Sequence, residues 1–161
     1  MTTIDVRGSV PRFPRREIVT FARRVLSALM GADAVVRPRG DSRAGARPGG
    51  RRRPPPRVDP HLSIAFVDDD TMRDLNRKFR RKNKTTDVLT FPGDDPTHLG
   101  DIVVSLDQAR RQAADEKHSL AIEVRYLVLH GILHALGYDH ETDDGEMNAL
   151  ELTLRARVGL D

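Results

Sequence analysis

One histidine-rich stretch, residues 130–140 with the sequence HGILHALGYDH, constrains this chain more than any other feature. Its first two histidines, His130 and His134, are four residues apart. Two side chains at that spacing on a helix lie on one face, roughly 5 to 6 Å apart at Cβ. Both rings can then bind one ion through bonds of about 2.0 to 2.1 Å. The spacing therefore predicts a helix that carries half of a tetrahedral metal site.

A glycine after this pair predicts how the chain brings in a third histidine. Gly137 stands where helices commonly end on a left-handed residue, a conformation that glycine adopts without strain. The reversed chain can then return His140 to the same ion. We therefore predict three histidine ligands for one metal ion, namely His130, His134 and His140.

Composition narrows the chemistry of this predicted site. The chain has 161 residues and no cysteine, so thiolate ligands, cysteine nucleophiles and disulfides are excluded. Three neutral imidazoles leave one position of a tetrahedral zinc ion open, which is typical of catalytic zinc. We expect one zinc ion as cofactor, although histidine sites also accept nickel, copper and iron.

The same spacing leaves a peptidase open as an alternative. The pattern H-x3-H-x2-G-x2-H is that of the metzincin zinc proteases, which place a glutamate directly after the first histidine as general base. This chain has Gly131 there, so a zinc hydrolase of peptides or amides would lack its usual base. Two histidines at helical spacing also occur without any metal, and the third histidine argues against that alternative.

Apolar periodicity predicts four strands and about five helices. Strand patterns cover residues 3–7, 62–67, 87–91 and 101–105, and helical patterns cover 15–30, 71–79, 107–116, 119–135 and a last segment after 144. Some connections are too short for parallel crossovers. We therefore expect an α+β fold, a small four-stranded mixed sheet packed with about five helices, with the metal site on the long central helix.

The sequence also predicts the apolar side of one helix and the N-caps of two others. The short helix after the acidic turn should carry Met72, Leu75 and Phe79 on its apolar side. Ser119 should be the N-cap of the long helix, and a residue of 142–144 should cap the last one.

A basic segment interrupts the apolar pattern. Residues 37–57 hold eight arginines against one acidic residue, with several prolines and glycines. Such a composition cannot bury enough apolar surface to offset its ordering entropy. We predict a disordered insertion at about 37–58 within a single domain covering 1–161. A passive loop is one role for it, and a salt-sensitive tether for RNA phosphates is the other.

The sequence shows neither the pattern of a membrane span nor that of a secretory signal. No apolar run approaches the 18 or so residues that cross a bilayer. The first residues, MTTIDVRGSV, lack the basic start and apolar core of a secretory signal. We expect a cytoplasmic protein without a membrane partner.

Three blocks in order resemble the YbeY endoribonuclease family, bacterial single-domain metalloproteins linked to ribosomal RNA maturation. They are LNRKFRRKNKTTDVLTFP at 75–92, LGDIVVS at 99–105 and the histidine stretch at 130–140. The resemblance covers about residues 62–158. Two positions depart from the family pattern, with Arg81 in place of a glycine and Thr90 in place of a serine.

The resemblance implies a single-strand-specific, zinc-dependent endoribonuclease of ribosomal RNA maturation and ribosome quality control. Its partners would be ribosomal RNA precursors and ribosomal particles. His130, His134 and His140 would be the zinc ligands, and Arg80 would act beside the metal on the RNA backbone. Arginine suits that task because its planar fork holds a phosphate bidentately and stays charged.

Other interpretations remain beside this one. The chain could be an RNA- or ribosome-binding assembly factor whose zinc is structural, and the basic loop around Arg80 could be a solvated charge run. No general base is evident, and Asp139 and Glu141 could instead orient a histidine. The other histidines, His61, His98 and His118, are predicted to be ordinary surface or turn residues.

Overall fold

The computed structural model describes residues 2–31, 60–94, 97–139 and 144–160. Within these ranges the elements in chain order are β1 (Thr3–Arg7), α1 (Arg15–Gly31), β2 (His61–Val67), α2 (Asp69–Arg80), β3 (Val88–Pro92), β4 (His98–Ser105), α3 (Leu106–Glu116), α4 (Leu120–Ala135) and α5 (Glu146–Val158). The predicted α+β class is confirmed. The predicted insertion at about 37–58 lies outside the described residues.

The four strands form one mixed sheet in the order β1-β2-β4-β3. β1 pairs with β2 and β2 with β4 in parallel, while β3 pairs with β4 antiparallel. A helix lies between the strands of the β1-β2 pair in sequence, as parallel crossovers require, whereas only residues 93–97 separate β3 from β4. The short connection therefore sets the antiparallel pair and leaves β3 at an edge.

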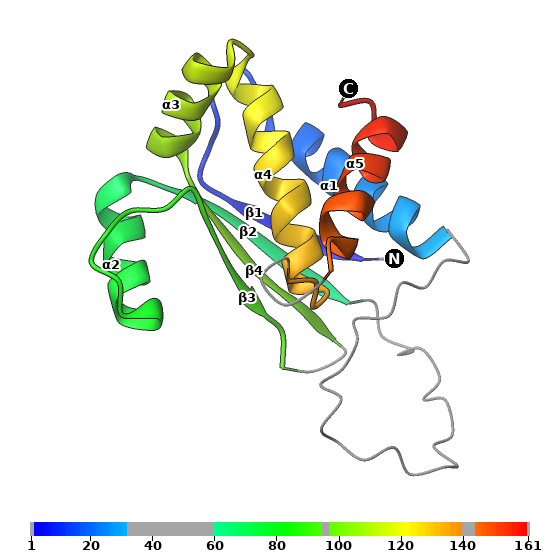
Figure 1. The fold of residues 1–161 in the computed structure, drawn as a ribbon, viewed down its shortest axis with the longest axis horizontal. Helices are drawn as coiled ribbons and strands as arrows, with labels where there is room; N and C mark the ends of the chain where they lie inside the picture. The colour runs from blue at the N-terminus through cyan, green and yellow to red at the C-terminus, as the bar shows by residue number, and fades with distance from the viewer. Residues whose placement is uncertain (1, 32–59, 95–96, 140–143, 161) are drawn as a thin grey trace.

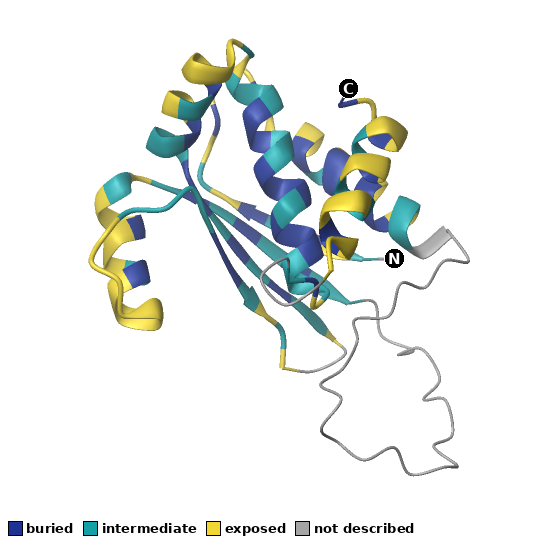
Figure 2. Cartoon of the chain, viewed as in Figure 1, coloured by how far each residue is buried: buried dark blue, intermediate teal, exposed yellow. Residues whose placement is uncertain are grey.

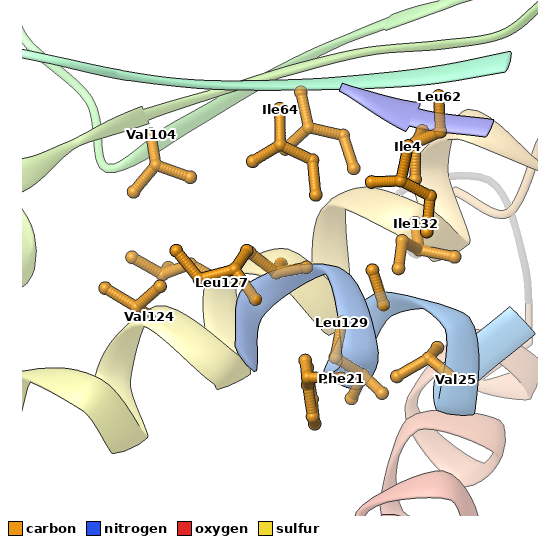
Figure 3. Close-up of a cluster of buried hydrophobic side chains, with 14 of the residues drawn as sticks. Ile4, Phe21, Val25, Leu62, Ile64, Val104, Val124, Leu127, Leu129 and Ile132 are labelled. Carbon is orange, nitrogen blue, oxygen red and sulfur yellow. The ribbon is translucent and has the colours of Figure 1, made fainter. Parts of the chain in front are cut away.

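α4 is the central helix of the molecule. Figure 1 shows α4, α1 and α5 together on one face of the sheet, with α4 against the strands. Figure 2 shows buried positions along much of its length, and they include Val124, Val128 and Ile132. In Figure 3, Leu129 points away from the sheet toward α1. Contacts on several sides explain why α4 is largely apolar around its axis.

α2 differs from its prediction at one residue. Met72 is fully buried and Leu75 is half-buried, as predicted, but 55% of Phe79 is exposed. Figure 1 shows the reason: α2 lies beside the sheet, away from α1, α4 and α5, so its last turn has little to pack against. The predicted apolar side is therefore covered at Met72 and Leu75 but largely open at Phe79.

The ends of the last two helices follow the predictions in part. Ser119 is the N-cap of α4 and its side chain accepts a hydrogen bond from the Ile122 amide at 3.2 Å, as predicted. The N-cap of α5 is Gly145. The N-cap position thus lies one residue beyond the predicted 142–144, and residues 142 and 143 lie outside the described residues. None of the described helices is long and apolar enough to span a bilayer.

Candidate functional site

Two imidazole rings converge on one point at the C-terminal end of α4. The Nε2 atoms of His130 and His134 are 3.0 Å apart, and the ring centroids are 4.6 Å apart at an interplanar angle of 75°. Two nitrogens bound to one tetrahedral zinc ion would be roughly 3.3 Å apart for bonds of about 2.05 Å. The pair therefore fits a shared metal ion with little movement.

Glu151 of α5 holds the first of these rings. Its Oε2 lies 3.3 Å from Nδ1 of His130, and its Oε1 accepts a hydrogen bond from Nη2 of Arg155 at 2.7 Å. Burial raises the pKa of Glu151, but the bonds to His130 and Arg155 outweigh burial and bring the pKa below its ordinary value. An ionised carboxylate only accepts hydrogen bonds, so Nδ1 carries the proton and the lone pair of the neutral ring lies on Nε2, the atom that would bind a metal.

The predicted glycine terminates α4. Gly137 has a φ of 95°, its amide donates to the His134 carbonyl at 2.9 Å, and the Tyr138 amide donates to the Leu133 carbonyl at 3.1 Å. These two bonds form a Schellman motif. The chain therefore reverses after His134 as predicted. His140, the third predicted ligand, lies outside the described residues.

Within the described residues, no group of three or more histidine, aspartate or glutamate side chains could hold a metal ion. Of the three predicted histidine ligands, the structure describes two, His130 and His134. The assignment of a metal to this place therefore stays a prediction.

A cavity of about 390 Å³ brings the predicted arginine to the histidine pair. The end of α2, the β3 segment and the end of α4 with the residues after it line the cavity, and their lining residues are Arg80, Asp87, Val88, Thr90, Pro92, His130, His134, Gly137, Tyr138 and Asp139. The side chain of Arg80 is exposed and makes no hydrogen bond or ion pair with the other described residues. Its neighbour Arg81 is not among the lining residues. A free guanidinium beside two imidazoles suits an anionic ligand.

Two features of the cavity were not predicted from the sequence. Thr90 is 7% exposed, and its hydroxyl has no hydrogen-bond partner among the described residues. A buried polar atom without a partner commonly marks a place where a water or ligand binds. Asp87 accepts hydrogen bonds from the Val88 amide at 2.8 Å and from Nε2 of Gln112 at 3.2 Å. These bonds hold the carboxylate of Asp87 at the cavity. From the sequence alone, Asp87 had no assigned role.

A second cavity of about 450 Å³ shares Asp87 and His130 with the first. His118 lines it and lies 2.5 Å, between Nε2 and Oε2, from Glu123, which is 7% exposed. His118 lies between α3 and α4, as predicted for a turn residue, and it is there the partner of a buried carboxylate.

The position of Gly131 bears on the peptidase alternative. A Cβ at this residue would lie 2.6 Å from Cγ2 of Ile102 in β4. Residue 131 thus faces the sheet and not the cavity, and only glycine fits there. A general base cannot be supplied from this position, so the peptidase alternative loses support.

The chain is similar to a known protein family. Residues 52–159 match the family model described as endoribonuclease YbeY. The chain belongs to this family. It is 48% identical over 99 residues to the endoribonuclease YbeY of Koribacter versatilis, and 45% identical over 105 residues to that of Nautilia profundicola. The alignments cover 62% and 64% of this chain, and 65% and 76% of the two relatives.

The fold has a counterpart among solved structures of proteins. The solution structure of TM1509 from Thermotoga maritima is similar, with a TM-score of 0.56 and 25% sequence identity. The match covers 97% of this chain and 89% of that protein. The family resemblance first seen in three sequence blocks is thus confirmed by the family model and by the named relatives.

Proposed function

We propose that this chain is a metal-dependent endoribonuclease that cleaves single-stranded RNA during ribosomal RNA maturation and ribosome quality control. The observation that carries this proposal is that the convergent His130 and His134 rings and the exposed Arg80 line one cavity. The printed name of the relatives supports RNA as the substrate. Ribosomal RNA precursors and ribosomal particles are the proposed partners.

The proposed metal ligands are His130, His134 and His140. Glu151 orients the first ring and keeps the proton on its Nδ1 atom. A zinc ion held there supplies Lewis-acid chemistry for phosphoryl transfer. Nickel, copper and iron would accept the same ligands, and zinc is the one that we propose.

Arg80 holds the phosphate in this proposal. Its guanidinium has no partner in the part of the chain that the structure describes, so no ion pair seen there must break before it binds the substrate. Two parallel N–H groups can bind two phosphoryl oxygens. Negative charge that develops on these oxygens in the transition state is then offset by a group already in place.

A carboxylate of the cavity is the proposed proton acceptor. Asp87 and Asp139 both line the cavity, and a general base must lie within hydrogen-bond reach of the proton it removes, directly or through one water. Gln112 and the Val88 amide orient the carboxylate of Asp87. We therefore propose Asp87 as the general base that accepts this proton.

The test compares cleavage of structured ribosomal RNA fragments by the wild type and three variants, with and without a chelator. We expect cleavage by the wild type to disappear with chelator and with His134→Ala. Arg80→Ala should lower the rate about 10²- to 10³-fold, the usual cost of losing one charge-stabilising group. Arg73→Ala, an exposed arginine of the same helix outside the cavity lining, is the matched control.

Circular dichroism and metal analysis establish that His134→Ala is folded and depleted of metal. Equal cleavage by the wild type and His134→Ala would reveal a contaminating nuclease. RNA binding without cleavage by any protein would favour the assembly-factor alternative, in which zinc is structural.

A further inference from the structure

Phe79 is an aromatic side chain that the fold leaves open to solvent. Of the described residues, only Phe79 and Leu152 are large hydrophobic side chains that are exposed, at 55% and 52%. An isolated exposed apolar residue is ordinary on a protein surface. Phe79 differs from Leu152 because its ring is held in place and because its surroundings are strongly basic.

The ring of Phe79 is oriented without being covered. It packs against Phe91 of β3 in an edge-to-face arrangement, with centroids 5.1 Å apart and an interplanar angle of 68°. The Nζ atom of Lys78 lies 5.3 Å from its centroid, and a flexible lysine moves aside at small cost. A fixed aromatic face loses little entropy when a flat partner binds to it.

The charge around Phe79 selects an anionic partner. Six basic residues fall within 77–84, all of them exposed, and they are Arg77, Lys78, Arg80, Arg81, Lys82 and Lys84. Of these, Arg77 pairs with Asp74 at 2.8 Å, which leaves most of the positive charge uncompensated. A basic surface with an exposed ring is typical of proteins that bind single-stranded nucleic acids.

Phe79 also lies beside the candidate site. The next residue, Arg80, lines the cavity, and so do Thr90 and Pro92, which flank Phe91. Successive residues of a strand point to opposite faces, so Phe91 and Phe79 meet on the other side of the edge strand from the cavity. A strand of RNA whose phosphate is bound by Arg80 would therefore have a neighbouring nucleotide at the edge of β3, within reach of Phe79.

We propose that Phe79 is a stacking platform for an unpaired base next to the phosphate that Arg80 binds, an inference that rests on the proposed function. The ring can stack only on a base that has left a duplex, because paired bases are already stacked on each other. Phe79 would thus contribute to a preference for single-stranded RNA. Losing one base–aromatic stack costs about 5- to 150-fold in Kd.

The first experiment measures binding of a single-stranded RNA oligonucleotide to the full chain by fluorescence anisotropy. Phe79→Leu keeps an apolar side chain but removes the flat ring, and Phe79→Tyr keeps the ring. We expect Phe79→Leu to weaken binding at least 5-fold and Phe79→Tyr to bind like the wild type. Leu152→Ala, which removes the other exposed apolar side chain, should leave the Kd unchanged.

The second experiment locates the base. A series of oligonucleotides carries 2-aminopurine at successive positions, and the fluorescence of this base is quenched when it stacks. One position should be quenched by the wild type and by Phe79→Tyr but not by Phe79→Leu. An abasic nucleotide at that position should weaken binding to the wild type and add no further loss to Phe79→Leu.

The outcomes separate this proposal from the proposed function. If the wild type binds and cleaves RNA while Phe79→Leu has the same Kd and the same quenching, the stacking proposal is overturned and the nuclease proposal stands. Phe79 would then belong to another surface, such as one for a protein partner. If the wild type neither binds nor cleaves RNA, both proposals fail.

Discussion

At the scale of single residues, Glu151 connects the candidate site to α5. Its carboxylate is 13% exposed and lies between the ring of His130 and the guanidinium of Arg155. Arg155 in turn lies 4.5 Å over the ring of Tyr126, whose hydroxyl donates to the Leu160 carbonyl at 2.7 Å. Glu151 therefore orients a proposed ligand, and Arg155 connects it to Tyr126, the residue of α4 that holds Leu160.

We predict that Glu151→Gln lowers zinc affinity about 10- to 100-fold, because the neutral amide no longer stabilises the proton on Nδ1 of His130. Competition with a fluorescent chelator measures the affinity. Asp115→Asn, an exposed carboxylate of α3, is the control and should bind zinc like the wild type. Unchanged affinity in Glu151→Gln would show that the carboxylate serves the fold alone.

At the scale of elements, Asp69 joins the start of α2 to β4 and α3. Its carboxylate accepts hydrogen bonds from Ser105 Oγ at 2.9 Å, Thr85 Oγ1 at 3.1 Å and Arg111 Nη2 at 2.7 Å. Burial raises the pKa of Asp69, but the bonds from Arg111, Ser105 and Thr85 outweigh burial, and the pKa lies below its ordinary value. The position of α2, and with it that of Arg80, depends on this ionised group.

This lowered pKa predicts part of the acid sensitivity of the fold. Ionised Asp69 stabilises the folded state fully above its unfolded pKa of about 3.9, and that contribution is lost as the pH falls toward the lower folded pKa. The free energy of unfolding should therefore decline less between pH 5 and pH 3 in Asp69→Asn than in the wild type. Urea titrations at several pH values measure it, with the exposed neighbour Asp70→Asn as control. Parallel pH profiles of wild type and Asp69→Asn would contradict the prediction.

The packing of α4 on β4 gives a second prediction at this scale. In Gly131→Ala the new Cβ would meet Cγ2 of Ile102 at 2.6 Å, so we expect a loss of about 1 to 3 kcal/mol in the free energy of unfolding. Ile102→Ala removes the clashing atoms but leaves a cavity. The double variant should lose less than the sum of the two single losses, as chemical denaturation can measure. Additive losses would mean that α4 does not approach β4 so closely.

At the scale of the whole molecule, three parts of the chain build one cavity. The end of α2, the edge strand β3 and the end of α4 each supply lining residues. α4 is held between the sheet on one side and α1 and α5 on the other (Figure 1). A metal ion on α4 would therefore be bound by the folded chain far better than by the unfolded one.

This arrangement predicts that zinc stabilises the fold. Zinc at about 100 times its Kd should raise the free energy of unfolding by roughly 2.7 kcal/mol, and chelator should reverse the gain. Thermal unfolding followed by circular dichroism measures the effect. His134→Ala should not respond to zinc, because it lacks one of the proposed ligands. A response of His134→Ala equal to that of the wild type would place the ion elsewhere.

The sequence by itself determined the local features of this protein. Periodicity predicted four strands and five helices close to their observed bounds, since each pattern reports which side of an element is buried. The spacing of His130 and His134 and the glycine at 137 predicted a ring pair and a helix end, because both depend on backbone geometry over a few residues.

Only the tertiary structure decided which distant residues meet. Arg80 shares a cavity with the histidines, and Glu151 contacts His130 from a helix 21 residues further along. Phe79 shares the apolar side of its helix with Met72 by spacing, but it is 55% exposed because the end of α2 lies away from α1, α4 and α5. These contacts depend on the strand order and on where each helix packs, which no local pattern of residues specifies.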